Sequence, residues 1–325
     1  MAPHAFTVSD AGFFVGTVAL LNSLHRNADA VPLTVLDRGL TDSQRRLLAP
    51  HCDLVDGGRD RHGYLAKVEA PLRSSADPAV LVDSDVVVVG PLREALAAAE
   101  KGRVFAFAEP YHSDRWFAEW NDLFALRAPL RHGTAVNAGF VALSPAQMPG
   151  LLDRWEALCE RIATRAATLS SWEDLRGTRE DPLWLSDQDA LNALLLSEVA
   201  EDRVVLGARR AMVMAPADLA ETRVVDHDSW RCEWHGEPVM LLHGIGLRKP
   251  WQRAAVRELR RTAYLGALRR FVSGPDLVVR IPEHELAPWL RPGLHGTAVR
   301  WALHAYELPA RRTRPWRHAR RHAAT

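Results

Sequence analysis

Short apolar runs alternate with segments of helical apolar spacing through the first half of the chain. The runs at 5–9, 33–36, 53–56 and 79–82 predict strands, and the segments at 13–24 and 42–48 predict helices. Strands that alternate with helices form βαβ units, which align the strands in parallel and place helices on the sheet faces. The sequence therefore predicts an α/β fold built on a mostly parallel sheet.

The pattern continues through the middle of the chain. It predicts strands at 86–89, 104–107, 136–143 and 239–242, and helices ending near 99 and spanning 145–167 and 187–196. A helix that carries Lys67 is expected from about Tyr64, an aromatic helix over 111–126, a polar loop over 168–181 and a basic helix over 253–272. Prolines interrupt the pattern after that point, so we expect a main domain over 1–272 and a C-terminal appendage over 273–325.

Charge is unevenly distributed along the chain, although the net charge is only +1. From Trp251 onward there are 15 arginines and 5 acidic residues, whereas the first 250 residues carry 26 basic and 35 acidic groups. A basic end on an acidic body predicts an anionic partner, and we expect peripheral contact with an anionic membrane surface through the tail. A solvated basic end is the alternative, and no motif supports nucleic-acid binding.

Cysteine usage and the N-terminus predict the compartment. The three cysteines, Cys52, Cys159 and Cys232, are widely spaced and show neither a disulfide framework nor a zinc pattern. The first ten residues show no signal-peptide pattern, and no apolar run reaches the roughly 18 residues that a membrane span requires. We therefore expect a cytoplasmic protein that contacts the inner face of the membrane, if any membrane, only peripherally.

Two acidic residues follow a very apolar predicted strand, because Asp83-Ser84-Asp85 comes directly after the run at 79–82. Ligands of open α/β sheets bind outside the carboxyl ends of the strands. Carboxylates at that position can hold Mg²⁺ or Mn²⁺, and the cation can in turn bind a diphosphate. A solvated acidic turn is the alternative for this motif taken alone.

A second segment, HGIGLRKPW from His243 to Trp251, follows the apolar run at 239–242. Neutral imidazole is a good ligand for Mn²⁺. Gly244 and Gly246 allow the backbone to approach phosphate oxygens, and Lys249 adds a positive charge for the same phosphates. The alternative is a glycine-rich turn with His243 in the core.

Together the two segments resemble glycosyltransferase family 8, which includes glycogenin and the bacterial lipopolysaccharide galactosyl- and glucosyltransferases. The family signature H-x-x-G-x-x-K-P-W is matched at its fixed positions by His243, Gly246, Lys249, Pro250 and Trp251, and the family D-x-D by Asp83 and Asp85. The resemblance implies a GT-A fold over the main domain. It also implies Mn²⁺ (or Mg²⁺) held by Asp83, Asp85 and His243, with diphosphate contacts from Gly246 and Lys249.

Weaker matches follow in the order of the family. The segment FTVSD at 6–10 resembles its first strand and uridine-binding turn, so that Val8, Ser9 and Asp10, together with Ser84, are expected to bind the nucleotide. Lys67 resembles the basic residue near the donor sugar and phosphate, and Asn137 the N-x-G asparagine that meets the sugar. The segment DQDALN that begins at Asp187 resembles the one beside the anomeric carbon.

Each weaker match also has a structural explanation. Asn137 can satisfy a strand end, Asp187 can cap a helix, and Lys67 can be a solvated side chain.

The resemblance implies retaining, metal-dependent transfer of a hexose from a UDP-sugar to an acceptor hydroxyl on a saccharide, a lipid-linked saccharide or another molecule. The cation would stabilise the leaving diphosphate. Asp187 and Gln188 are the candidates to support an oxocarbenium-like sugar electrostatically. The sequence leaves open whether one of them is a nucleophile or the acceptor attacks from the leaving-group face.

Two other functions are consistent with parts of the sequence. Asp83 in D-x-D-x-V could be the nucleophile of a phosphatase-like hydrolase, and the chain could bind a sugar nucleotide without turnover. The aromatic residues of 111–126 at core spacing predict a buried helix face, with an acceptor platform as the alternative: Trp116, Phe117, Trp120 and Phe124.

Overall fold

The computed structural model describes residues 2–27, 31–58, 63–166, 180–245, 249, 251, 262–293, 296 and 299. A seven-stranded sheet in the order β3-β2-β1-β4-β7-β6-β8 forms its centre. The strands are β1 (His4–Ser9), β2 (Leu33–Asp37), β3 (Asp53–Asp56), β4 (Ala79–Val82), β6 (Val104–Ala108), β7 (Val136–Leu143) and β8 (Val204–Leu206). Neighbours pair in parallel except at β7, which runs antiparallel to β4 and β6. The predicted mostly parallel sheet is confirmed.

Two small sheets lie beside the central one. The first has the order β5-β13-β9, with β5 (Val86–Val88), β9 (Met212–Val213) and β13 (Leu241–His243). The second has the order β10-β11-β12, with β10 (Arg223–Asp226), β11 (Arg231–Trp234) and β12 (Glu237–Val239). The predicted strand at 86–89 is β5, which lies in a different sheet from the preceding strand β4. The predicted strand at 239–242 is divided between β12 and β13.

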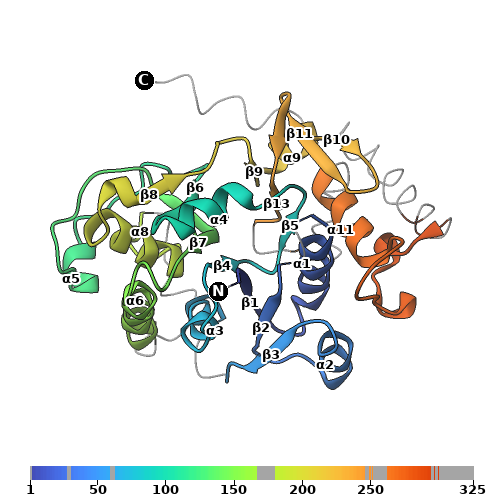
Figure 1. Ribbon diagram of the computed structural model, residues 1–325, viewed down its shortest axis with the longest axis horizontal. Helices are drawn as coiled ribbons and strands as arrows, with labels where there is room; N and C mark the ends of the chain where they lie inside the picture. The colour runs from blue at the N-terminus through green and yellow to red at the C-terminus, as the bar shows by residue number, and fades with distance from the viewer. Residues whose placement is uncertain are drawn as a thin grey trace, which may run out of the picture.

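Helices cover both faces of the central sheet, as the two core clusters show (Figure 1). Side chains alternate between the faces along each strand, so that Val80 and Val82 join one cluster while Ala79 and Leu81 join the other. The first cluster includes α1 (Phe14–Asn27), α4 (Arg93–Glu100) and α11 (Ala263–Ser273). The second includes α3 (Glu69–Leu72), α5 (Trp120–Phe124), α6 (Leu151–Ala166) and α8 (Asp187–Ser197). Two further described helices, α2 (Asp42–Leu48) and α9 (Pro216–Glu221), each contribute a buried leucine to the first cluster.

The sheet contains one topological switch point that matters for binding. From β1 the chain passes through α1 to β2 on one side, and it later returns to pair β4 with the other side of β1. Ligands of such sheets bind in the crevice at the carboxyl ends of the strands on either side of the switch. Here those strand ends carry Ser9 and Asp83.

Three predicted helices differ from the structure. Lys67 lies in the turn between a 3₁₀ helix (Gly63–Ala66) and α3, so it is not on a helix. The aromatic helix is confined to α5, and the non-helical chain before it lets Arg115 donate to Asp189 of α8. The helix expected from residue 145 begins at Leu151, after Gly150 at φ +77°.

The segment beyond α11 packs into the core of the main domain. Val279, Ile281, Leu286 and Leu290 belong to the same cluster as α1. Asn22 of α1 donates hydrogen bonds to the carbonyl oxygens of residues 271 and 279 (2.7 and 2.9 Å) and accepts one from the amide of residue 279 (2.9 Å). The domain boundary at 272 stays a prediction, and the described part of the appendage packs directly on α1.

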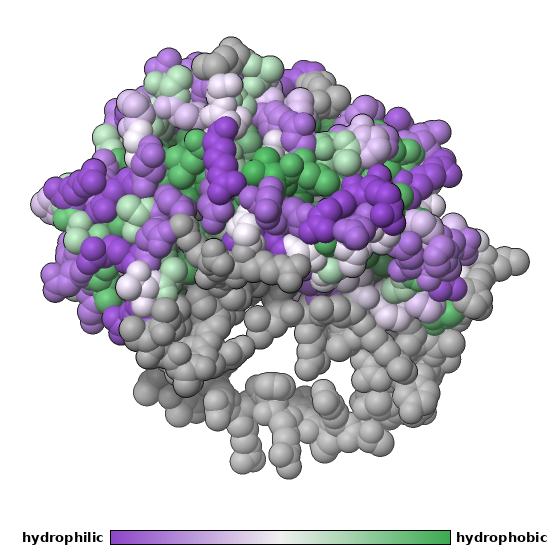
Figure 2. Space-filling model, turned by 90° about the horizontal axis from the view of Figure 1, so that it is seen from below, coloured by the Kyte–Doolittle hydropathy of each residue, from purple (hydrophilic) through white to green (hydrophobic). Residues whose placement is uncertain are grey.

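The surface view from below shows hydrophilic residues over most of the described part, with a smaller hydrophobic area between them (Figure 2). Few large hydrophobic side chains are exposed among the described residues, namely Tyr111, Leu206 and Val225. No described helix is long and apolar enough to cross a membrane. The three cysteines are free thiols. The basic tail with Trp301 and Trp316 lies outside the described residues, so its membrane contact stays a prediction.

The contact of Asn22 with the segment beyond α11 leads to a stability prediction. Replacing Asn22 by Ala leaves the buried carbonyl oxygens of residues 271 and 279 without this donor, which we expect to lower the free energy of unfolding by about 3 kcal/mol. Urea unfolding monitored by circular dichroism measures the loss. Asn121→Ala, on the exposed face of α5, is the matched control and should change stability by less than about 0.5 kcal/mol. Equal midpoints for the Asn22 variant and the wild type would show that this contact does not stabilise the fold.

Candidate active site

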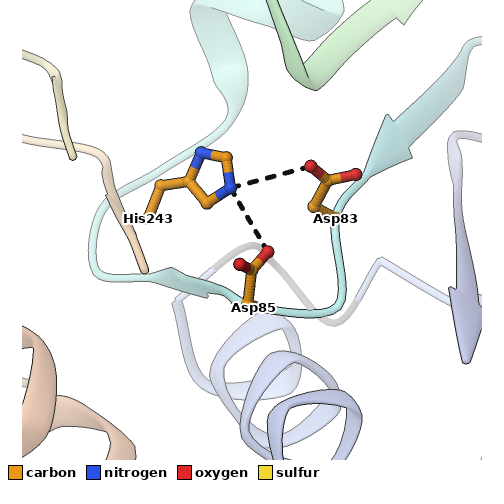
Figure 3. A group of neighbouring side chains, drawn as sticks. All are labelled: Asp83, Asp85 and His243. Carbon is orange, nitrogen blue, oxygen red and sulfur yellow. Dashed lines mark ion pairs between the residues drawn. The ribbon is translucent and has the colours of Figure 1, made fainter. Parts of the chain in front are cut away.

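Asp83, Asp85 and His243 converge at the carboxyl end of β4. The Nε2 atom of His243 lies 3.2 Å from Oδ1 of Asp85 and 3.6 Å from Oδ2 of Asp83, and the imidazole points between the two carboxylates (Figure 3). One possible ligand atom from each of the three side chains lies within 4.8 Å of the others. The structure thus brings together the three residues that the sequence assigned to a metal.

Pairing of two short strands produces this convergence. The turn 83–85 joins β4 of the central sheet to β5 of the small sheet, and β13 pairs antiparallel with β5 so that His243 lies opposite Val86. The amide of Gly244 also donates to the carbonyl oxygen of Asp85 (3.1 Å). His243 and Asp85 are about 160 residues apart in the sequence. The strand pairing makes them neighbours, because His243 lies opposite Val86, the residue that follows Asp85.

A glycine makes room for the imidazole. A Cβ atom on Gly139 of β7 would lie 2.3 Å from Cε1 and 2.8 Å from Nδ1 of His243, so a larger residue would displace the ring. The Nδ1 atom is buried and has no hydrogen-bond partner among the described residues. Within that part of the chain, the polar contacts of the imidazole are therefore those of Nε2 with the two carboxylates.

Two lysines neutralise the two aspartates of the motif separately. Nζ of Lys67 lies 2.6 Å from Asp83 and 3.1 Å from Asp187, and it donates to the carbonyl oxygen of Ala138 (2.8 Å). Nζ of Lys249 lies 2.5 Å from Oδ2 of Asp85. Lys67 and Lys249 are only 7% and 6% exposed, so the solvated-lysine alternative for Lys67 is wrong.

Burial and charge act in opposite directions on these groups. Burial lowers the pKa of the Lys67 ammonium, but the carboxylates of Asp187 and Asp83 outweigh burial and hold this pKa above its ordinary value. Burial raises the pKa of Asp85, but Lys249 and then His243 outweigh burial and hold it well below its ordinary range. These shifts favour the charged forms of Lys67 and Asp85 at neutral pH, which buried groups tolerate only in close contact with opposite charge.

An irregularity in β7 supplies backbone groups to the site. The register of β6 against β7 shifts between Ala106 and Phe107, which leaves residues 138–140 of β7 outside the regular pairing with β6. The amide of Ala138 donates to Oε1 of Gln188 (3.0 Å), and its carbonyl oxygen accepts from Lys67. Such bulges commonly occur next to active sites because they free backbone polar groups from the sheet.

The start of α8 carries the predicted catalytic pair into the same region. Asp187 and Gln188 are 7% and 8% exposed, and Asp187 contacts Lys67. Burial raises the pKa of Asp187, since the attraction of Lys67 does not fully offset the loss of solvation. Asn192, one turn further along α8, exchanges hydrogen bonds with both backbone groups of Val136 (2.6 and 2.9 Å). This contact fixes α8 against β7, which carries Asn137.

The start of α1, which follows the predicted nucleotide-binding turn, lies against the metal-site motif. A Cβ atom on Gly16 of α1 would meet the carbonyl oxygen of Ser84 at 2.3 Å and the Trp251 ring at 2.6 Å. The hydroxyl group of Ser9 contacts that of Thr17 (2.6 Å). Val8 lies next to Ser9 near the end of β1 and is half-buried.

Asp10 organises the turn between β1 and α1. Its Oδ1 accepts from the amides of Gly12 (2.7 Å) and Phe13 (3.1 Å). Trp251 donates from Nε1 to the carbonyl oxygen of Gly12 (2.7 Å), so the end of the H-x-x-G-x-x-K-P-W segment is held against the β1 turn. Gly246 lies outside the described residues.

Sequence reasoning missed two charged residues of the site. Glu109 follows the apolar strand β6 as Asp83 follows β4, and its carboxylate accepts from the amide groups of Asn137 and Gln188. Arg115 forms a buried ion pair with Asp189 at 2.5 Å and lies over the ring of Phe117. An acidic residue at the end of an apolar strand was a signal for Glu109, whereas Arg115 lies in a loop with no recognisable pattern.

Two of the four aromatic residues expected on a helix face of the segment 111–126 lie in the core, and Phe117 is half-buried. Trp120 and Phe124 of α5 are fully buried, as expected for a helix face in the core. Trp116 is half-buried, stacks on His132 with 4.2 Å between ring centroids, and donates from Nε1 to the carbonyl oxygen of Arg131.

The donor set is chemically suited to a divalent cation. Two carboxylates and one imidazole are ligands that Mn²⁺ accepts, and Mg²⁺ prefers the carboxylates. The Gly139 cradle holds the imidazole ring beside both carboxylates. The residues present therefore fit the metal that the resemblance implies.

Comparison with known proteins identifies the fold. No protein-family model matches the chain, and no curated protein sequence matches it. Among solved structures, the galactosyltransferase LgtC in complex with donor and acceptor sugar analogs is 15% identical, with a TM-score of 0.53 over 86% of this chain and 98% of LgtC. An active-site mutant of LgtC is 17% identical, with a TM-score of 0.52.

A third solved structure is similar over a part of its length. The bifunctional glycosyltransferase WbbM is 15% identical, with a TM-score of 0.50 over 82% of this chain. The chain spans about half (49%) of WbbM. At these identities the likeness concerns architecture, so the chain has the GT-A fold of these glycosyltransferases, while membership of family 8 stays a prediction.

The buried pair of Arg115 and Asp189 leads to a pH-dependent stability prediction. Burial raises the pKa of Asp189 from 3.8 to about 6, although Arg115 opposes the shift. Between these values the folded protein holds a proton that the unfolded chain has released, so the contribution of this group to stability falls as the pH rises through that window.

Replacing Arg115 by Met should lower the free energy of unfolding by about 3–5 kcal/mol, because it leaves the buried carboxylate of Asp189 without its partner. We call this loss the stability deficit of the variant. It should also raise the pKa of Asp189 further, so the deficit relative to the wild type should be larger at pH 8 than at pH 5. Urea unfolding at the two pH values measures both deficits. The control is the double variant Arg115→Met/Asp189→Asn. Its stability deficit should be the same at pH 5 and pH 8, because the side chain at position 189 no longer titrates. A deficit for the single variant that does not change with pH would contradict the prediction.

Proposed function

We propose that this protein is a metal-dependent, retaining glycosyltransferase that moves a hexose from a UDP-sugar to an acceptor hydroxyl of a saccharide or a lipid-linked saccharide. The observation that carries the proposal is the convergence of Asp83, Asp85 and His243 at the switch point of a GT-A fold, next to Asp187 and Gln188. LgtC, which is similar over most of the chain, is a galactosyltransferase crystallised with donor and acceptor sugar analogs, which supports the same substrate classes here.

Asp83, Asp85 and His243 would hold Mn²⁺ or Mg²⁺, which supplies Lewis-acid stabilisation of the leaving diphosphate. Lys249, already beside Asp85, would place its ammonium on the phosphates, together with the backbone at Gly246. Val8, Ser9 and Asp10 would bind the nucleoside together with Ser84, because the start of α1 after their turn lies against Ser84.

The sugar would lie near Lys67, Asn137 and the start of α8. Gln188 and the buried carboxylate of Asp187 would stabilise positive charge on an oxocarbenium-like sugar. Lys67 would hold Asp187 and Asp83 in fixed relative positions through its two ion pairs. We favour electrostatic support by Asp187 and Gln188 over a covalent intermediate, and we propose retention at the anomeric carbon from the family resemblance.

Release of UDP from a panel of UDP-sugars, measured with and without Mn²⁺, tests the proposal. We expect Mn²⁺-dependent UDP release from at least one member of the panel. A phosphatase-like hydrolase would release inorganic phosphate instead, and a non-catalytic binding protein would bind UDP-sugars without turnover. Either result would overturn the proposal.

Replacing Asp85 by Asn removes one ligand and leaves the volume of the side chain nearly unchanged. We expect UDP release to fall by at least about 100-fold and binding of UDP to lose its dependence on Mn²⁺, because loss of charge stabilisation in an active site typically costs this much. Calorimetry and the UDP-release assay measure the two effects. Asp153→Asn, on the exposed side of α6, is the matched control and should behave as the wild type. Unchanged Mn²⁺-dependent binding in Asp85→Asn would refute its assignment as a ligand.

Replacing Lys249 by Met should have opposite effects on the cation and on the nucleotide. It frees Asp85 from its 2.5 Å ion pair, so Mn²⁺ alone should bind more tightly. It also removes the ammonium proposed for the phosphates, so UDP should bind about tenfold or more weakly in saturating Mn²⁺. Electron paramagnetic resonance of free Mn²⁺ measures the first effect and calorimetry the second, with Lys101→Met at an exposed position as control. Weaker binding of Mn²⁺ alone would show that Lys249 does not compete for Asp85.

A further inference from the structure

Glu109 is a buried carboxylate at the edge of the sheet where the site lies. It follows β6 directly, and β6 runs parallel to β4 with β7 between them, so Glu109 and Asp83 leave the sheet on the same side. It is only 5% exposed. Its Oε1 atom accepts from the backbone amide of Tyr111 at 3.3 Å. The hydrogen bonds that occupy its other oxygen atom indicate its role.

Oε2 of Glu109 accepts hydrogen bonds from two side-chain amides on different elements. Nδ2 of Asn137, on β7, donates at 2.8 Å, and Nε2 of Gln188, on α8, donates at 3.0 Å. The oxygen ends of both amides are occupied by backbone donors. Oε1 of Gln188 accepts from the amide of Ala138 (3.0 Å), and Oδ1 of Asn137 accepts from the amide of Gly139 (2.8 Å).

This arrangement allows only one orientation of each amide group. If the amide of Gln188 or of Asn137 turned by half a rotation, its NH₂ group would face a backbone N–H and its oxygen would face the carboxylate. Both hydrogen bonds of that amide would then be replaced by repulsive contacts in a buried place, where unsatisfied polar groups are costly. A carboxylate at position 109 is suited to fixing both amides, because an ionised carboxylate accepts hydrogen bonds and cannot donate them.

We infer that Glu109 is a positioning residue, whose carboxylate fixes the orientation of the Gln188 and Asn137 amides toward the donor sugar. The inference rests on the proposed function, in which Gln188 and Asn137 contact the sugar. Glu109 acts through these two amides and does not itself touch the reacting atoms. The negative charge of Glu109 is then secondary, and its ability to accept two hydrogen bonds is what the site requires.

Two variants separate orientation from charge. Glu109→Gln keeps one oxygen that can accept from both amides, and it loses the charge and the long hydrogen bond from the Tyr111 amide. We expect kcat for transfer to stay within about fivefold of the wild type. Glu109→Ala removes the acceptor, so kcat should fall by about 100-fold, the effect expected when a reacting group is misplaced by about an ångström. Affinity for UDP in Mn²⁺ should be unchanged in both variants, because the proposed function places the two amides against the sugar and the nucleotide against other residues.

A control shows whether lost stability alone explains the result. Glu198→Ala removes another partly buried carboxylate, which pairs with Arg154 at 2.7 Å at the far end of α8. It should lower the unfolding midpoint and leave kcat unchanged. Wild-type kcat in Glu109→Ala, or equally low kcat in Glu109→Gln and Glu109→Ala, would overturn the positioning role.

A reciprocal exchange tests the pairing without any measurement of activity. Gln188→Glu alone would place two carboxylates where a 3.0 Å hydrogen bond now exists, so we expect a lower unfolding midpoint in urea. Glu109→Gln/Gln188→Glu restores one amide and one carboxylate between these two positions and should recover part of the lost midpoint. The recovery should be incomplete, because an amide NH₂ group at position 109 cannot accept from Asn137. If the exchange recovers nothing, Glu109 does not orient Gln188. If the exchange recovers the midpoint while the wild type releases no UDP from any UDP-sugar, the pairing stands and the proposed function fails.

Discussion

Crowding of negative charge at one edge of the sheet is the constraint on which the rest of this structure depends. Four carboxylates lie around the switch point with two ammonium groups between them, namely Asp83, Asp85, Glu109 and Asp187 with Lys67 and Lys249. When all four are ionised, two negative charges remain uncompensated among these groups. Such a cluster is costly to bury unless a cation or a network of donors meets it. The same excess charge would attract a divalent cation to the proposed site.

Irregular features of the fold, more than its regular elements, build the site. The chain leaves the central sheet after β4 and enters a small sheet at β5, and the turn between them carries both aspartates of the motif. The strand that pairs with β5 brings the imidazole from the distant end of the chain. The bulge of β7 frees the backbone groups of Ala138 for Lys67 and Gln188. Each of these departures from regular sheet pairing contributes a contact that a regular strand could not make.

Sequence reasoning predicted the parts of the structure that depend on local patterns. The alternation of apolar runs and helical segments predicted the sheet and its main helices, because burial on both faces leaves a continuous apolar run in each strand. The placement of Asp83 after a buried strand and of His243 after another indicated that both lie at a sheet edge. Only the family resemblance predicted that Asp83 and His243 lie close together. The sequence pattern could not predict it, because strands of three residues carry too little information to show that β5 pairs with β13.

Other features depend on tertiary contacts and could not be predicted. Lys67 was expected on a helix, but two ion pairs hold it in a turn. The aromatic segment was expected to be one long helix, but the Arg115–Asp189 pair shapes the chain before α5. Glu109 carried the same pattern as Asp83, an acid after an apolar strand, and its role emerged only from the two amides that it contacts.

The most direct test of the central claim is diffraction at the manganese absorption edge from crystals soaked in Mn²⁺ and UDP. The account predicts an anomalous peak within about 2.0–2.3 Å of oxygen atoms of Asp83 and Asp85 and of Nε2 of His243. That peak should also contact the diphosphate. An anomalous peak elsewhere on the protein, or bound UDP with no cation between these three side chains, would contradict it.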